Sequence, residues 1–563
     1  MNSRFLRVRP LPLAIGLALL LVLLGLPGEN NNGPSALAAP PSQESPILPT
    51  GELKPVNVAE RGPAEWAATP EPAAAVSAET APIRPQDGPE AYQAAKAAAN
   101  AKAAEARAAG ATKPDPDAAA RAAALGPSLV ADDASPLAPP ILKQKNFEGV
   151  NQTAAGGLRP PDTHGAVGKS SFVEIVNSRL LVYRKSDGLL QKSVSLAAFF
   201  GYGTTTIFDP RAVYDLHWDR FIATAEAWPD PVSGVQYHFI AVSKTSNPLG
   251  AWWVYTYQDL SFGGAGFWDY PDVGYTQDAV IITGNWFDNA TGACQSLVWA
   301  APKAQWYNGR APGLGFFAGL PCTLKPPIVL DGNPNAYFVA ANNLTHLHLY
   351  RGNNLSNLGY QTLVPQAAVD VPDYAVPPNA AQPGTPDLLD TLDRRFVNAS
   401  TQYGDSLWNV HTIAFGAWPA PKFYELDTEG PGANTVKQQG FFWESGTSYD
   451  WNASIAANQS GEAFVTWNST DVSGAPHQAR IRFSGRQPAD PLGLIPAGST
   501  LFTSPTFYNP SSDLVERWGD YSAVSLEPLP AGACAANRRA WIVNEKINAF
   551  NIWGSRIARI GFC

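Results

Sequence analysis

Five aspartates stand shortly before a pair of small or apolar residues that recurs along the chain. Asp209, Asp269, Asp450 and Asp520 lie three residues before such a pair, and Asp162 lies four before one. Carboxylates gathered at one place can hold Ca²⁺ through their oxygens. Two carboxyls with separated pKa values can act as general acid and general base in glycoside cleavage. These five aspartates are the candidate catalytic residues.

Cationic, polar and aromatic residues share the segments that carry these aspartates. The candidate ligand-binding residues are His164, Arg211, Trp268, Arg395, Trp451, Asn452, Arg517, Trp518 and Tyr521. Guanidinium groups can fork onto a ligand carboxylate, and aromatic rings offer flat apolar faces to a sugar. The set suits an acidic or neutral polysaccharide. The alternative is that each aspartate caps its own turn and that the tryptophans pack between repeats.

The elements that must position these residues are short strands. From about Lys143, alternating apolar runs are separated by Gly, Pro, Asn and Asp turns, which is typical of an all-β chain. One complete unit runs through residues 211–215, 220–227, 236–244 and 252–258. Four antiparallel strands in about 50 residues indicate one blade of a β-propeller.

The unit recurs, and we expect an all-β, seven-bladed β-propeller, with six blades as the second choice. In such a fold the first strand of each blade lines the central channel, so the aspartates would converge on one channel mouth. The last unit lacks a fourth strand before the chain ends. Residues 143–149 can supply that strand and close the ring, because closure leaves no bare sheet edge.

Composition narrows the function classes. The chain has 563 residues, 15% charged, with a net charge of −9. A broad nucleic-acid surface needs a dense cationic stripe, so no nucleic-acid partner is expected. A long apolar run occurs only within the first 26 residues, which excludes a multi-pass membrane protein.

The N-terminal region predicts export. Arg4, Arg7 and Arg9 precede an apolar run from Leu11 to Leu26, and small residues follow at 36–38. We expect a signal peptide over 1–38, a largely disordered Ala/Pro-rich linker over 39–140, and the propeller domain over 141–563. A retained N-terminal anchor and a propeptide role for the linker stay open as alternatives.

The four cysteines support the same compartment. Their even number in an exported chain predicts two disulfides, and proximity in the sequence pairs Cys294 with Cys322 and Cys534 with Cys563. The chain has no CxxC spacing, so a structural zinc site is not expected.

Several motifs add a resemblance. They are PPDTHGAVG at 160–168, DPRAVYD at 209–215, SNPLGAW at 246–252, DYP at 269–271 and RWGDYS at 517–522. In these motifs the chain resembles a largely uncharacterised group of exported bacterial β-propeller proteins. The resemblance implies a propeller and an extracellular or cell-envelope setting, and it transfers no catalytic residue.

The primary hypothesis is a secreted or envelope-associated propeller, monomeric, that binds an extracellular glycan at its channel mouth. A second hypothesis is a glycoside hydrolase or polysaccharide lyase that uses two of the five aspartates. A third is a cell-surface scaffold for protein partners. Ca²⁺ is the cofactor that clustered carboxylates would favour, and no membrane span is expected beyond the signal segment.

Overall fold

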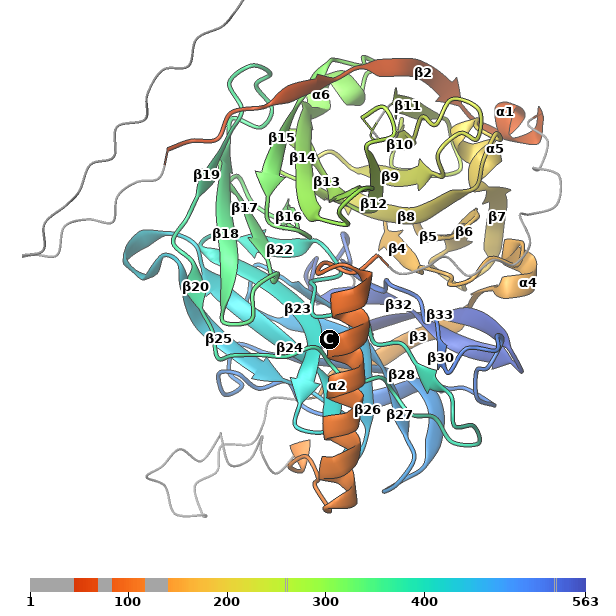
Figure 1. Cartoon of the computed structure of the whole chain (residues 1–563). Helices are drawn as coiled ribbons and strands as arrows, with labels where there is room; N and C mark the ends of the chain where they lie inside the picture. Colours follow the sequence, from red (N-terminus) through yellow and green to blue (C-terminus); the bar gives the residue numbers. More distant parts are fainter. Residues whose placement is uncertain are drawn as a thin grey trace, which may run out of the picture. The chain divides into compact units, whose positions relative to one another are not determined.

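The structure is a computed structural model. It describes residues 45–68, 84–116, 140–258, 260, 262–530, 532 and 534–563. The predicted signal peptide lies outside the described residues. Antiparallel sheets dominate the described chain and are arranged as the blades of a β-propeller (Figure 1). The all-β propeller class is therefore confirmed.

Five sheets of four or five strands stand separately. The first contains β4 (His164–Val167), β5 (Ser171–Val176), β6 (Arg179–Arg184) and β7 (Leu190–Ser195). The second contains β8 (Ile207–Asp215), β9 (Arg220–Ala227), β10 (Tyr237–Ser243), β11 (Trp252–Gln258) and β2 (Pro55–Arg61). The third contains β17 (Ala336–Ala340), β18 (His346–Asn353), β19 (Thr362–Pro365) and β20 (Val369–Asp370).

The two remaining separate sheets come from the C-terminal part of the chain. One contains β26 (Tyr449–Ala457), β27 (Ala463–Asp471), β28 (His477–Arg486) and β29 (Ser499–Thr503). The other contains β31 (Ala523–Leu526), β32 (Arg539–Ala549), β33 (Ile552–Gly561) and β3 (Leu142–Asn151). A short parallel pair, β21 (Leu388–Leu389) with β30 (Val515–Glu516), stands apart from them.

The sixth large sheet has ten strands. In order across the sheet they are β1 (Gly51–Leu53), β15 (Leu314–Leu320), β14 (Cys294–Pro302), β13 (Ala279–Asp288), β12 (Gly266–Tyr275), β16 (Pro327–Val329), β22 (Ser400–Tyr403), β23 (Ser406–Phe415), β24 (Trp418–Asp427) and β25 (Thr435–Phe441). The prediction of seven separate blades is corrected here, because five blades are distinct sheets. The short strand β16 pairs in parallel with both β12 and β22 and joins their strands into one sheet.

Apolar side chains between neighbouring sheets form the core. Phe221 and Trp252 of the second sheet are fully buried with Phe199 of helix α5 (Leu196–Phe200), and the Phe199 and Trp252 ring centroids are 5.2 Å apart. Strands such as β5 and β8 are buried along their whole length. This double-sided burial fits blades that pack face to face, since neither face meets solvent.

The closing strand was predicted at 143–149 and is found as β3, which pairs antiparallel with β33. It covers the edge that the last blade would otherwise expose. Both predicted disulfides, Cys294–Cys322 and Cys534–Cys563, are also present. Among the described helices, none is long and apolar enough to cross a membrane.

Part of the predicted linker has regular structure. The described residues 45–68 contain β1, β2 and helix α1 (Pro63–Ala68), and β2 adds an outer strand to β11 (Figure 1). Residues 84–116 contain helix α2 (Pro89–Ala108). In these two ranges the expectation of a largely disordered linker does not hold. The rest of the linker lies outside the described residues.

Helix α2 docks on the propeller through polar contacts. It presents only Tyr92, Lys96 and Ala103 as buried residues. The Tyr92 hydroxyl donates to Asp390 at 2.8 Å, and Lys96 Nζ donates to Thr391 Oγ1 at 2.8 Å. The helix therefore lacks a broad apolar face, as its alanine-rich sequence suggests, and hydrogen bonds hold it in place. Two short α-helices, α4 (Gln152–Ala155) and α6 (Lys303–Trp306), and a 3-10 helix, η1 (Gly430–Gly432), complete the described helices.

Candidate functional site

Four of the five predicted aspartates line one small cavity. They are Asp162, Asp209, Asp269 and Asp520, and we term this space the carboxylate cavity. Its other lining residues are Arg84, Phe208, Trp228, Phe267, Tyr270, Arg395 and Arg517. It encloses ≈ 20 Å³. That is room for about one water molecule or a bare ion, since a water needs roughly 10–15 Å³.

Bulges in the innermost strands aim these side chains. Pairing of β8 with β9 breaks between Phe208 and Arg211, and pairing of β12 with β13 breaks between Asp269 and Asp272. Asp209 has φ 48° inside the first break, a left-handed conformation that aspartate tolerates better than most residues. A bulge bends the strand and redirects its side chains, here toward the cavity.

A chain of hydrogen bonds connects three of the carboxyl-bearing segments. Asp162 accepts from the Asp520 backbone N–H at 2.7 Å and from the Asn177 side chain at 2.6 Å. The Asn177 side-chain oxygen Oδ1 in turn accepts from the Asp209 backbone N–H at 2.8 Å. The Tyr521 hydroxyl donates to the Asp209 carboxylate. The positions of the carboxyls are therefore fixed by neighbouring blades.

The arginines of the cavity are already paired. Arg517 donates to Asp520 with both terminal nitrogens, at 2.9 and 3.1 Å. Arg395 binds Asp393 in the same two-pronged way, and the Asp393 pKa is held below its usual range by Arg395 despite burial. Such bidentate pairs are strong and geometrically specific. Each of these two guanidinium groups is accordingly already bound to a protein carboxylate.

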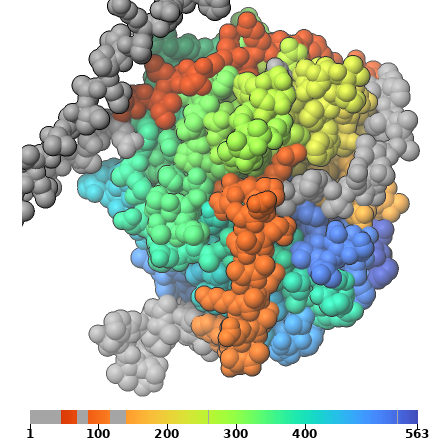
Figure 2. All heavy atoms as spheres, in the orientation of Figure 1, coloured from red at the N-terminus to blue at the C-terminus, as the bar shows by residue number. Residues whose placement is uncertain are grey.

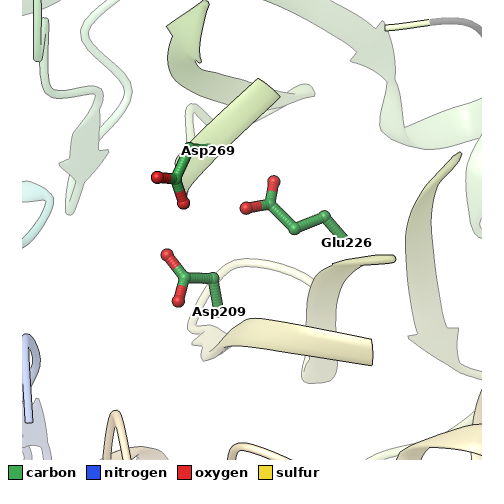
Figure 3. A group of neighbouring side chains, drawn as sticks. All are labelled: Asp209, Glu226 and Asp269. Carbon is green, nitrogen blue, oxygen red and sulfur yellow. The ribbon is translucent and has the colours of Figure 1, made fainter. Parts of the chain in front are cut away.

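A tight triad forms one wall of the site. Asp209, Glu226 and Asp269 point toward one another, and one oxygen of each lies within 4.8 Å of the others (Figure 3). Burial, with repulsion from the neighbouring carboxylates, raises the pKa of Asp209 to about 8. Burial raises the pKa of Asp269 to about 6, and Arg84 opposes that shift. The pKa of Glu226 is also raised, chiefly by burial.

Asp450, the fifth predicted aspartate, is not in the cavity. It is fully buried and receives hydrogen bonds from Lys113 Nζ at 2.8 Å and from the Trp467 indole at 2.9 Å. Its place in the sheet explains the difference. Asp209 lies two residues before pairing resumes at Arg211, whereas Asp450 lies four before pairing resumes at Ser454. The sequence alignment placed both aspartates three residues before the recurring small or apolar pair, so it did not show that their distances from the paired part of the strand differ.

Most predicted ligand-binding residues have structural contacts instead. Arg211 is fully buried and binds the Pro271 and Val397 carbonyls and the Asn398 side chain. Trp268 packs against Trp299 in a tilted arrangement, with ring centroids 4.8 Å apart. Four more of these residues bond or pack within the protein, namely Trp451, Asn452, Trp518 and Tyr521. Of the nine, only Arg395 and Arg517 line the carboxylate cavity.

His164 lies in a different cavity. That space, ≈ 60 Å³, is lined mainly by small and apolar residues of the innermost strands β4, β8, β12, β16, β22, β26 and β31 and of adjoining residues. His164 Nδ1 accepts from the Ala212 backbone N–H at 3.3 Å. Burial, assisted by Arg211, lowers its pKa to about 3, so the ring stays neutral. This geometry favours a structural role.

Sequence reasoning missed Arg84 and Glu226. Arg84 comes from the predicted linker, yet its Nε lies 3.7 Å from Asp269 and its guanidinium carbon 3.8 Å from the centre of the Phe267 ring. Nothing in the linker composition indicates that contact. Glu226 carried a weak signal, because it is the one acidic residue in a mostly apolar strand, 220–227. A buried strand rarely keeps an acidic side chain without a reason.

Comparisons with known proteins give a distant likeness only. No protein-family model and no curated protein matches the chain. The chain is similar to a solved exo-β-1,3-galactanase of Phanerochaete chrysosporium, with 12% identity over 75% of this chain and 96% of that one, at a TM-score of 0.30. The hemagglutinin-neuraminidase of parainfluenza virus 5 gives 11% identity over 62% and 94%, at 0.34. A Dyadobacter fermentans protein of unknown function gives 10% over 64% and 95%, at 0.33. Likeness at this level assigns no activity to this chain.

Proposed function

We propose that this protein is an exported β-propeller that binds an extracellular glycan at the carboxylate cavity. The observation that carries the proposal is the occupation of the cavity by Arg84. This arginine belongs to the N-terminal segment rather than to a blade, and it occupies the position between a carboxylate and an aromatic face that a ligand would take. The two disulfides fit an extracellular protein.

The walls of the cavity suit a sugar. The carboxylates of Asp162, Asp209, Asp269 and Asp520 can accept hydrogen bonds from hydroxyl groups. Phe208, Trp228 and Phe267 form an aromatic surface beside them, with ring centroids 5.0 Å apart for Phe208 and Trp228 and 5.2 Å apart for Trp228 and Phe267. Acceptors next to aromatic faces match the alternation of hydroxyl edges and apolar faces on a pyranose.

The charge of the site favours a neutral or amino sugar over an acidic one. Arg395 and Arg517 are already paired with Asp393 and Asp520, so they offer little to a ligand carboxylate. A uronate would also meet several protein carboxylates at short range. The expected ligand is therefore an uncharged or aminated polysaccharide.

Arg84 must move before a sugar can enter. The ≈ 20 Å³ now enclosed is far below the volume of about 300–1,000 Å³ typical of small-molecule pockets. Arg84 is held at one end by Asp269, and its carbonyl oxygen accepts from Arg395 at 2.8 Å. Residues 84–116 thus act as a cover whose displacement opens the site. Figure 2 shows α2 of this segment on the molecular surface, in orange.

The test is a glycan array on the full chain and on Arg84→Ala, followed by calorimetry on any hit. We expect Arg84→Ala to bind neutral or amino glycans at least about tenfold more tightly, because the competing side chain is gone. Arg107→Ala is the matched control. Arg107 lies in the same segment but donates to the Ala417 carbonyl, away from the cavity. Equal binding by both variants, or none by either, would exclude the proposal.

The hydrolase or lyase hypothesis and the scaffold hypothesis stay predictions. Reducing-sugar release, measured in parallel on Arg84→Ala, separates cleavage from binding. Export and a monomeric state are likewise proposals that belong with this function.

A further inference from the structure

We propose that Asp209, Glu226 and Asp269 form a binding site for a divalent cation of the oxygen-preferring class, with Ca²⁺ as the probe. The proposal concerns a metal site and does not depend on glycan binding. It rests on the arrangement of the three carboxylates, on the contacts of Glu226, and on the local balance of charge.

The arrangement matches the size of a cation. One oxygen from each residue lies within 4.8 Å of the others, and Figure 3 shows the three carboxylates converging. Ca²⁺ holds oxygens at about 2.3–2.6 Å, so two ligands on opposite sides of it are roughly 5 Å apart. Asp209 and Asp269 line the carboxylate cavity, whose ≈ 20 Å³ suits an ion or a water.

The ligands stand on rigid supports. Glu226 lies in β9, opposite Phe208 of β8, and Asp269 lies in β12 of the neighbouring blade. Strand positions fix side chains more tightly than loops do, which favours a preformed metal site.

Glu226 supplies the independent sign of a missing ligand. Its side chain is 0% exposed, and no described residue outside the triad donates a hydrogen bond to either carboxylate oxygen; its close polar neighbour is the Asp269 carboxyl. His238 is opposite it in the ladder, but the His238 ring bonds to Thr224 instead. Burial of an ionised carboxylate without a donor is strongly unfavourable.

Another buried glutamate shows how the fold normally treats such a group. Glu174 is also 0% exposed, yet it accepts from the Val150 backbone N–H at 3.1 Å, from the Tyr183 hydroxyl at 2.9 Å and from the Ser555 hydroxyl. The propeller can therefore satisfy a buried carboxylate with protein donors. At Glu226 it provides none.

The charge count selects a divalent ion. Three carboxylates carry −3 when ionised. Arg84 Nε lies 3.7 Å from Asp269 and contributes +1, while no described lysine, arginine or histidine forms an ion pair with Asp209 or Glu226. The nearby Arg395 is matched by Asp393. Arg211 also acts on Asp209, and the carboxyl of Asp162 in the same cavity has no ion-pair partner among the described residues. These two charges offset each other, so a cation of charge +2 completes the balance.

A shared proton is the rival explanation. If Glu226 were protonated, it could donate to Asp269, and the pair would need no metal. The two explanations predict different results when Ca²⁺ is added: a metal site binds the ion, whereas a pair of carboxyls that shares a proton does not.

The experiment uses the full oxidised chain after treatment with chelator, at pH 7.5, titrated with CaCl₂ and separately with MgCl₂ by calorimetry. We expect one site per chain. Glu226→Gln should weaken Ca²⁺ binding by at least about tenfold, since affinity follows the number of charged ligands. Glu174→Gln, the matched control, should bind as the wild type does.

Absence of Ca²⁺ and Mg²⁺ binding by the wild-type chain would overturn the proposal and favour the shared proton. Unchanged Ca²⁺ affinity in Glu226→Gln would overturn the assignment of these ligands. If Glu226→Gln fails to fold, Asp269→Asn gives the same test. Glycan binding by Arg84→Ala in excess chelator is a separate measurement, so the two proposals can fail independently.

Discussion

Asp450 differs from Asp209 and Asp269, although all three aspartates precede a small or apolar pair at the same spacing. Asp450 and Asp209 are buried and Asp269 is half-buried, and buried Glu226 of β9 joins Asp209 and Asp269 to form the triad. Asp450 is met by Lys113 at 2.8 Å and by several hydrogen-bond donors. The triad has only Arg84 at 3.7 Å as an ion-pair partner among the described residues. One region is neutralised by a close ion pair, and the other gathers three carboxyl groups beside one arginine.

The comparison shows that a repeated aspartate becomes available for binding only where the rest of the chain leaves it unmatched. Lys113 and Arg84 both come from the segment 84–116, which lies outside the blade repeats. The same segment therefore neutralises Asp450 with a close ion pair from Lys113, and it places Arg84 beside Asp269 in a longer one. Substitutions at the two regions should have opposite effects on stability.

Lys113→Met should have the largest effect. Lys113 and Asp450 are almost fully buried, and removal of one partner leaves an uncompensated charge. Such changes typically destabilise by about 3–5 kcal/mol. Chemical denaturation should show a loss of unfolding free energy of this size. Alternatively, residues 84–116 should separate from the propeller before global unfolding, and hydrogen exchange would detect this.

The matched control is Lys102→Met, an exposed lysine of α2 in the same segment 84–116, for which we expect a change below about 0.5 kcal/mol. The double variant Lys113→Met with Asp450→Asn should recover much of the loss. If Lys113→Met proves as stable as its control, the ion pair does not hold the segment.

Glu226→Gln should have the opposite sign. In chelator, loss of one unpaired buried carboxylate should stabilise the chain by about 1–2 kcal/mol, because the amide can also donate to a neighbouring carboxylate. Denaturation of wild type, Glu226→Gln and Glu174→Gln measures this. Glu174→Gln removes a fully hydrogen-bonded carboxylate and should destabilise. Destabilisation by both variants would mean that Glu226 is satisfied in a way these contacts do not include.

The sequence indicated the parts of this comparison that depend on local pattern. Alternating runs identified antiparallel blades, the unpaired last repeat pointed to the closing strand at 143–149, and close spacing paired Cys294 with Cys322. Contacts between distant segments were invisible. Lys113 with Asp450 spans 337 residues. The bulges that shift Asp450 away from the cavity leave no mark in a linear alignment, nor does the bridging role of β16.

The docking of α2 should depend on pH through Lys96. Burial lowers the pKa of Lys96 to about 8, opposed by the carboxylates of Asp390 and Asp393. Undocked, its pKa returns to about 10.4, so the undocked state binds more protons between these values. Docking should therefore strengthen as pH rises from 8 to 9.5, by at most about 1.4 kcal/mol per pH unit.

Hydrogen exchange of α2, corrected for the intrinsic rate at each pH, measures this dependence. The upper limit of pH 9.5 stays below the ordinary titration of Tyr92, whose hydroxyl also binds Asp390. Arg517 also contacts Asp390 and keeps its charge throughout the range. Lys96→Met should abolish the dependence. Weaker docking at higher pH would show that the ion pair of Lys96 with Asp390 outweighs its burial.

Asp87→Ala should have the smallest effect, although it also breaks an ion pair between the segment and the propeller. Asp87 binds Arg394 with both carboxylate oxygens, but its side chain is 44% exposed, against 0% for Asp450. Arg394 is buried, but water already solvates the Asp87 carboxylate, so we expect a contribution near the range of about 0.2–1 kcal/mol found for exposed pairs. When both variants are measured by chemical denaturation, Lys113→Met should therefore lose several times more free energy of unfolding than Asp87→Ala. Equal losses would show that the number of ion pairs, rather than their burial, holds the segment over the carboxylate cavity.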